Sequence, residues 1–185
     1  MDGDTRVIET PRLVLRPMRL ADVDDLLHLF GDPVVMAAFA SDPFDRRQME
    51  QWVERNLEHQ ERFGYGLFSV IRQTDGALIG DCGLERLEDE SVELGYDLRR
   101  DCWNQGFATE VAAAVRDHAF HVLNLPRLIS LIRQGNIASR RVAEKIGMRH
   151  EADLTRYERD YWRFAIDREM ATDDEGDQIR ELTLR

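Results

Sequence analysis

The chain has 185 residues, of which 43% are hydrophobic, so it is long enough to bury one sizeable core and favours a single domain. Its net charge is -11, from 25 lysines and arginines against 36 aspartates and glutamates, which argues against nucleic acid as a partner. An acidic surface is compatible with a cationic partner such as an amine, but solubility is the simpler explanation.

The cysteines, the histidines and the N-terminal segment indicate the cellular compartment and whether a metal is expected. Its two cysteines, Cys82 and Cys102, form no CxxC pair, which fits a reducing compartment and argues against a zinc site. His118 and His121 lack a third ligand at motif spacing, so we expect no metal. The N-terminus has no signal-peptide pattern and no apolar run approaches the length of a spanning helix. We therefore expect a cytoplasmic protein that does not interact with membranes.

The first third of the chain predicts a strand and two helices. Residues 9–18 read as a short strand, and residues 20–33 place apolar side chains at helical spacing before Gly31 and Pro33. A second helix over residues 46–63 has an apolar stripe and a candidate cap in Asp42 or Asp45.

The middle of the chain changes to a period of two. Residues 66–72 and 77–87 flank a turn that contains Asp75 and Gly76, and residues 91–98 form the next strand. These three strands predict an antiparallel meander.

The last part predicts a crossover and closing strands. A helix from about Gln105 leads to residues 126–133, a strand that is apolar on both faces and therefore runs parallel to a neighbour. Asn136 caps a further helix that ends at Gly147, and strands over 148–154 and 160–170 close the sheet.

The predicted architecture is a mixed α/β fold with about four helices. They flank a mostly antiparallel, twisted sheet that is splayed at one parallel strand pair. We assign residues 1–170 to one domain and residues 171–185 to a polar tail.

Two helix starts are candidates for ligand binding. Gly106 opens the helix after the meander, so the backbone N–H groups from Asn104 to Thr109 are free to bind an anion such as a pyrophosphate, although a purely structural turn is an equal alternative. Asn136 opens a second helix at the same sheet edge. Gly95 indicates a bulge or local splaying that would expose Leu94 and Gly95 to an extended amide-bearing ligand such as pantetheine.

At this point the chain resembles the GNAT superfamily of acyl-coenzyme A (CoA) N-acyltransferases, and within it the RimJ/RimL-like branch of ribosomal-protein N-terminal acetyltransferases. The resemblance spans about residues 10–170 and rests on an ordered set of segments. These are "TPRLVLRPM", "GALIGDCGL", "VELGYDL", "WNQGFATE", "NIASRRVAEKIGM" and "RDYWRFAI".

The resemblance implies direct transfer of an acetyl group from acetyl-CoA to a primary amine in a ternary complex. It places the pyrophosphate loop on Trp103 to Ala108, the pantetheine contact on Asn136, and a hydrogen bond to the leaving sulfur on Ser139. Asn104 and Gln105 depart from the usual glycine and basic residue. The predicted CoA-binding residues are Leu94, Gly95, Trp103, Asn104, Gln105, Gly106, Phe107, Ala108, Thr109, Asn136 and Ser139.

The chemistry needs a base, a group that polarises the thioester carbonyl, and a proton donor for the thiolate. Glu93 is the candidate base, with a solvated or arginine-paired carboxylate as the alternative, and Leu94 or Gly95 offers the polarising N–H. The resemblance places the usual tyrosine acid at Phe164, which has no proton to give. Ser139 is therefore the candidate donor; Tyr157 and Tyr161 are alternatives.

The acceptor stays open at this level. A protein N-terminus or a small amine fits equally, and Trp52, Phe39 and Phe44 are candidates for the acceptor wall, with core packing preferred for Trp52. Two other readings compete: a non-catalytic acyl-CoA sensor, and a transferase for another acyl-CoA such as succinyl-CoA. A homodimer is plausible for the superfamily.

Overall fold

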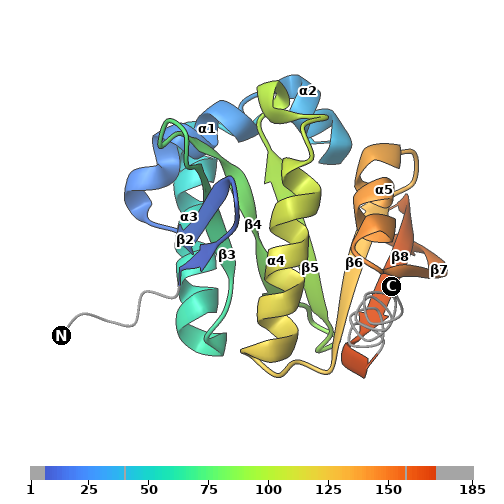
Figure 1. Cartoon of the computed structure of the whole chain (residues 1–185). Helices are drawn as coiled ribbons and strands as arrows, with labels where there is room; N and C mark the ends of the chain where they lie inside the picture. Colours follow the sequence, from blue (N-terminus) through green and yellow to red (C-terminus); the bar gives the residue numbers. More distant parts are fainter. Residues whose placement is uncertain (1–6, 40, 157, 170–185) are drawn as a thin grey trace.

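The computed structural model describes residues 7–39, 41–156 and 158–169, and the expected tail 171–185 lies outside them. Its sheet has eight strands in the order β1-β2-β3-β4-β5-β6-β8-β7 (Figure 1). The strands are β1 (Ile8–Glu9), β2 (Leu13–Pro17), β3 (Leu67–Arg72), β4 (Leu78–Arg86), β5 (Val92–Leu98), β6 (Arg127–Arg133), β7 (Arg149–Arg156) and β8 (Arg159–Asp167). All neighbours are antiparallel except β5 and β6, which confirms the predicted mixed fold.

Helices cover both faces of this sheet. They are α1 (Val23–Phe30), α2 (Pro33–Met36), α3 (Arg46–Phe63), α4 (Phe107–His121) and α5 (Ile137–Lys145). Helices α4 and α5 lie on one face, while α1 to α3 pack on the other (Figure 1). Four of these helices were predicted; the short α2 and the two-residue β1 were not, because neither is long enough to show a period.

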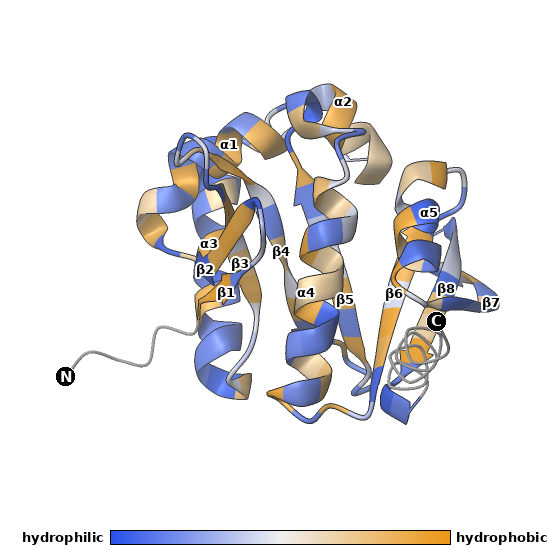
Figure 2. Cartoon of the chain, in the orientation of Figure 1, coloured by the Kyte–Doolittle hydropathy of each residue, from blue (hydrophilic) through white to orange (hydrophobic). Residues whose placement is uncertain are grey.

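Each face has its own buried apolar cluster. The cluster under α4 and α5 includes Val111, Val115 and Phe120, and that under α1 to α3 includes Leu26, Met49 and Val53. Within the described residues no helix is long and apolar enough to cross a bilayer, and α3 and α4 mix hydrophilic with hydrophobic positions (Figure 2).

Helix α3 shows how local sequence sets the wall of the later site. The Asp45 carboxylate accepts a hydrogen bond from the Gln48 N–H at 2.8 Å, and the Gln48 side-chain oxygen accepts one from the Asp45 N–H. This capping box confirms Asp45 rather than Asp42 as the cap. The helix ends at Gly64, whose φ of 75° is left-handed.

The parallel pair is splayed, as predicted. Only Glu93 and Ile129 are in register between β5 and β6, so the two strands separate beyond that point. The prediction of a bulge at Gly95 is wrong, because β4 and β5 pair in one continuous register from Gly80–Leu98 to Arg86–Val92. The opening therefore comes from the divergence of two regular strands rather than from an extra residue.

Candidate active site

The turn before α4 has the geometry of an anion site. Asn104 and Gly106 adopt left-handed conformations, with φ values of 60° and 81°. Gly106 is the N-cap and has no side chain that could cap the first N–H groups of the helix, at Phe107, Ala108 and Thr109. Those N–H groups and the positive end of the helix dipole favour a phosphate.

Arg12, which lies between strands β1 and β2, contacts the turn before α4. One Nη donates to the Gln105 carbonyl at 2.9 Å, and the guanidinium lies 4.3 Å from the centre of the Phe107 ring. Its Nε donates to Glu110 at 2.6 Å. Sequence reasoning missed Arg12, because its partners are more than 90 residues away and leave no local signal.

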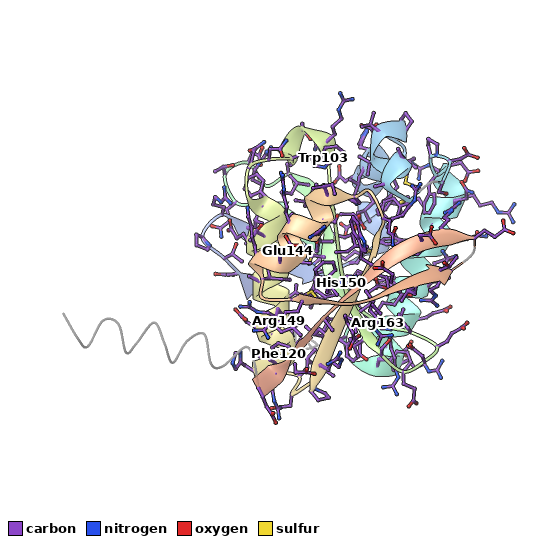
Figure 3. All side chains as sticks on the ribbon, turned by 90° about the vertical axis from the view of Figure 1, so that its right-hand side faces the viewer. Trp103, Phe120, Glu144, Arg149, His150 and Arg163 are labelled. Atoms are coloured by element: carbon purple, nitrogen blue, oxygen red, sulfur yellow. The ribbon has the colours of Figure 1, made fainter. Side chains whose placement is uncertain are left out.

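Trp103 lies at the edge of the molecule where α4 begins (Figure 3). Its indole N–H donates to the Leu98 carbonyl at 2.7 Å, which fixes the ring beside the end of β5. Trp103 is 41% exposed, so part of its side chain is accessible to a ligand.

A cleft of about 180 Å³ lies between the diverging strands β5 and β6. Asn136 and Ser139 from the start of α5, and Tyr96 from β5, are among its lining residues. The Asn136 side-chain oxygen accepts from the Ser139 N–H at 3.1 Å, and the Tyr96 hydroxyl donates to the Ser139 carbonyl at 2.8 Å. The Asn136 amide NH₂ and the Ser139 hydroxyl therefore remain as donors for a ligand in the cleft.

The backbone of β5 presents alternate residues to this cleft. The Leu94 carbonyl accepts a hydrogen bond from the Ser130 hydroxyl at 2.7 Å, which places the polar backbone groups of Leu94 on the β6 side. Because these groups alternate along a strand, those of Tyr96 face the same side, and those of Gly95 face β4. The groups of Leu94 are already paired with β6 where the two strands are still in register, so Tyr96, further along the strand, is the residue whose backbone groups face the opening.

Glu93 stands at the point where the two strands part. Its half-buried carboxylate accepts a hydrogen bond from the Leu131 N–H of β6 at 2.9 Å. Burial is the main cause that raises the pKa of Glu93 to about 7, with the negative charges of Glu85 and Asp97 adding to it. The Leu131 N–H and Arg156 act in the opposite direction. A carboxylate with a pKa near neutrality is suited to act as a general base.

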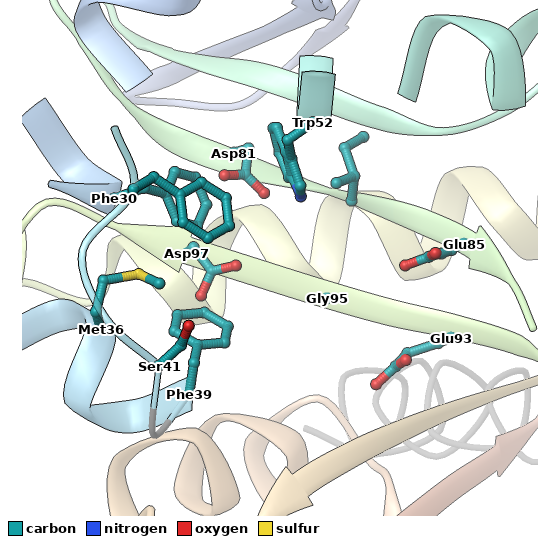
Figure 4. Close-up of a pocket in the computed structure, with 12 residues that line it drawn as sticks. Phe30, Met36, Phe39, Ser41, Trp52, Asp81, Glu85, Glu93, Gly95 and Asp97 are labelled. Atoms are coloured by element: carbon teal, nitrogen blue, oxygen red, sulfur yellow. The ribbon is translucent and has the colours of Figure 1, made fainter. Parts of the chain in front are cut away.

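A larger cavity of about 370 Å³ opens on the α1 to α3 face. Its apolar wall contains Phe39, Phe44 and Trp52, the three aromatic residues that the sequence proposed for this position (Figure 4). Trp52 also packs against Phe30, with the ring centres 5.1 Å apart and the rings tilted by 47°, so it serves packing as well. The complete wall comprises Phe30, Met36, Phe39, Ser41, Phe44, Trp52 and Leu67.

The two cavities share four lining residues, Phe39, Glu93, Gly95 and Asp97. Phe39 is held across the cleft, because Arg159 donates to its carbonyl at 2.7 Å and Arg133 donates to the Ala37 carbonyl at 2.9 Å. Glu93 therefore faces both the cleft between the strands and the aromatic cavity.

The floor of the larger cavity carries two facing pairs of carboxylates. In the β4–β5 register Asp81 lies opposite Asp97, and Glu85 opposite Glu93. Asp81 is 1% exposed, and neither of its oxygens has a hydrogen-bond partner among the described residues. Burial raises the pKa of Asp97 to about 7; burial and the nearby Asp97 raise the pKa of Asp81 well above its usual range. Sequence reasoning missed the Asp81–Asp97 pair, although Asp81 stands out as an aspartate within an otherwise apolar stretch of β4.

Replacing Asp81 by asparagine is expected to raise the melting temperature at pH 8. The pKa of an aspartate in the unfolded chain is about 3.9. The folded-state pKa of Asp81 is raised, so between the unfolded-state and folded-state pKa values the folded state binds more protons than the unfolded chain. The folded state therefore loses stability as the pH rises through that range. The gain is therefore expected to be smaller at pH 5, with about 2–4 °C for each kcal/mol in a chain of this size. Thermal unfolding at both pH values measures it.

Asp89→Asn serves as the matched control for this change. Hydrogen bonds from Ser91 lower the pKa of the exposed Asp89, so its removal is expected to leave the melting temperature unchanged or lower it. A gain at pH 8 as large as that of Asp81→Asn would show that any lost negative charge stabilises this acidic chain.

Phe164 occupies the position in β8 at which the resemblance places the usual tyrosine acid. Phe164 is 2% exposed and lies opposite Ser130 in the register of β6 and β8, within the core under α5. Tyr161, three residues before Phe164 in β8, lines the cleft together with Ser139. Tyr157 lies outside the described residues.

The fold and the splayed strand pair are those of an acyl-CoA-dependent acetyltransferase, and the family model described as "Acetyltransferase (GNAT) domain" matches residues 12–149. The chain belongs to this GNAT acetyltransferase family.

Relatives and solved structures agree with this assignment. The chain is 35% identical over 161 residues to the uncharacterized protein YkkB of Bacillus subtilis, covering 85% of this chain and 92% of that protein. It is 33% identical over 157 residues to the uncharacterized N-acetyltransferase p20 of Bacillus licheniformis, covering 81% and 86%. RimL, a ribosomal-protein alpha-N acetyltransferase solved with coenzyme A, has the same fold, with a TM-score of 0.74, 20% identity and coverage of 88% and 98%.

Proposed function

We propose that this acetyltransferase moves an acetyl group from acetyl-CoA directly to a primary amine, with Glu93 as the base. The observation that carries the proposal is the position of Glu93, which lines both the cleft between β5 and β6 and the aromatic cavity. A donor in the cleft and an acceptor in the cavity would then meet at this carboxylate.

The residues of the cleft fit the coenzyme. The N–H groups after Gly106 would hold the pyrophosphate, and the Asn136 amide together with the β5 backbone would bind the amides of pantetheine. Residues 104 and 105 are Asn and Gln rather than basic residues, so the backbone N–H groups would make the main contacts with the phosphate. The coenzyme would supply a thioester carbonyl and a thiolate leaving group.

The chain's own groups account for each proton in the transfer. Glu93 accepts one proton of the acceptor ammonium, directly or through one water, and the freed nitrogen attacks the thioester carbonyl to form the C–N bond. The nitrogen gives up its second proton as the C–S bond breaks, and this proton replaces the one that the thiolate takes from its donor, so that the products are the amide and the free thiol. The backbone N–H of Tyr96, which faces the opening, would polarise the carbonyl in place of the Leu94 or Gly95 N–H expected from the sequence. Ser139 or Tyr161, which both line the cleft, would protonate the leaving thiolate.

Two assays on one preparation test which acyl-CoA the protein uses and whether it turns over. The purified protein is titrated calorimetrically with acetyl-CoA, succinyl-CoA and CoA, and thiol release is then followed with a panel of primary amines and peptides. Tight binding of acetyl-CoA and thiol release with a primary amine are expected. Binding without release from any acceptor would contradict the proposal and favour a sensor, and preferred turnover of succinyl-CoA would reassign the donor.

A further inference from the structure

The carboxylate pair Asp81–Asp97 has no role in the transfer step described above. It lies at the opposite end of the aromatic cavity from Glu93, with Gly95 between the two ends (Figure 4). Asp97 follows Glu93 by four residues on one strand, so their Cα atoms are about 13 Å apart and their side chains share a face.

The pair lacks the partners that buried carboxylates normally have. Asp81 is 1% exposed, lines the cavity, and has two oxygens without a hydrogen-bond partner among the residues described. Residues directly opposite on antiparallel strands have Cβ atoms about 5 Å apart, so the Asp97 carboxylate adds a second negative charge at the same place. A buried anionic pair of this kind is costly unless a cation or a shared proton compensates it.

The part of the cavity between Glu93 and the aspartate pair fits an aliphatic chain that carries an ammonium group at each end. A Cβ added at Gly95 would meet no atom of the described residues within 4 Å, so the middle of the floor is open. Phe30, Phe39 and Trp52 wall this space, and aromatic faces attract ammonium groups as well as methylenes.

We propose that Asp81 and Asp97 bind a second ammonium group of the acceptor, so that the preferred substrate is a small, flexible diamine or oligoamine. One amine lies at Glu93 and is acetylated, while the other end is held by the aspartate pair. This inference rests on the proposed function, because it names the acceptor class for the same cavity.

The test compares an eight-carbon α,ω-diamine with octylamine, which has the same chain and a single amine. The ratio of their kcat/KM values is measured in the wild type, Asp81→Asn, Asp97→Asn and Glu54→Gln at alkaline pH, where Glu93 is ionised. Glu54 is exposed on α3, so its variant controls for the loss of one negative charge.

The wild type and Glu54→Gln are expected to prefer the diamine at least tenfold, and the ratio should fall toward one in both aspartate variants. A ratio near one in the wild type, or a preference that survives in Asp81→Asn and Asp97→Asn, would overturn the inference. A purely structural role would lower both substrates equally and leave the ratio unchanged.

Calorimetric binding of the diamine separates this inference from the proposed function. Binding that weakens tenfold or more in Asp97→Asn supports the second ammonium site even if no acceptor releases thiol. Acetylation of octylamine or of peptides, with diamine binding equal in wild type and Asp97→Asn, would leave the transferase intact and refute the site.

Discussion

Gly106→Val is expected to weaken CoA binding at least tenfold. Gly106 has a φ of 81°, where a β-branched residue is strained by about 1–3 kcal/mol, so the backbone would leave the conformation that directs the first N–H groups of α4 outward. A Cβ there would also lie 3.4 Å from an Nη of Arg12, which braces the turn. Calorimetric titration with CoA measures the change.

The control for this variant is Gly64→Val. Gly64 also has a left-handed φ, of 75°, and an added Cβ would meet no atom within 4 Å in the described part of the chain. It lies at the end of α3, so the backbone strain is matched while the CoA turn is untouched. Equal CoA affinity in Gly106→Val and wild type would refute the phosphate-binding turn.

Glu93→Gln is expected to lower kcat/KM for a primary amine by about 100- to 10,000-fold, the usual contribution of a general base. The pKa of Glu93 is raised to about 7, so wild-type activity should rise with pH below neutrality as the base ionises, and then level off. The variant depends on amine that is already neutral, so its activity should keep rising toward the amine's own pKa near 10.

The inflection must be assigned against a second group, because the pKa of Asp97 is also raised to about 7. Asp97→Asn should keep an inflection, moved to lower pH because one negative charge that raises the pKa of Glu93 is gone. Glu85 and Arg156, the other charges acting on Glu93, are unchanged in both variants. An inflection near pH 7 that persists in Glu93→Gln would remove Glu93 from the mechanism.

The sequence predicted the elements of the fold because their periods are local. The α3 stripe, the meander and the apolar strand over residues 126–133 are each visible within one segment, and all three appear in the structure. The splay between β5 and β6 also followed, since Gly95 and a parallel neighbour pointed to it. The bulge did not, because a glycine in a strand fits close or open surroundings without an extra residue.

The parts of the site that were not predicted depend on register and long-range contact. Alternation placed Glu93 and Asp97 on one face of β5, but only the pairing with β4 shows that Asp81 and Glu85 lie opposite them. Arg12 reaches Gln105 from the other end of the chain. Tyr161 was named from the sequence as an alternative donor, but its position in the cleft depends on the pairing of β8 with β6, which no local pattern specifies.

A crystal structure of the protein with CoA would test the central claim most directly. We predict that the pyrophosphate lies on the N–H groups that follow Gly106, the pantetheine arm runs between β5 and β6 past Asn136, and the sulfur ends beside Glu93. A coenzyme seated elsewhere, or a sulfur that does not reach the junction of the two cavities, would contradict the account.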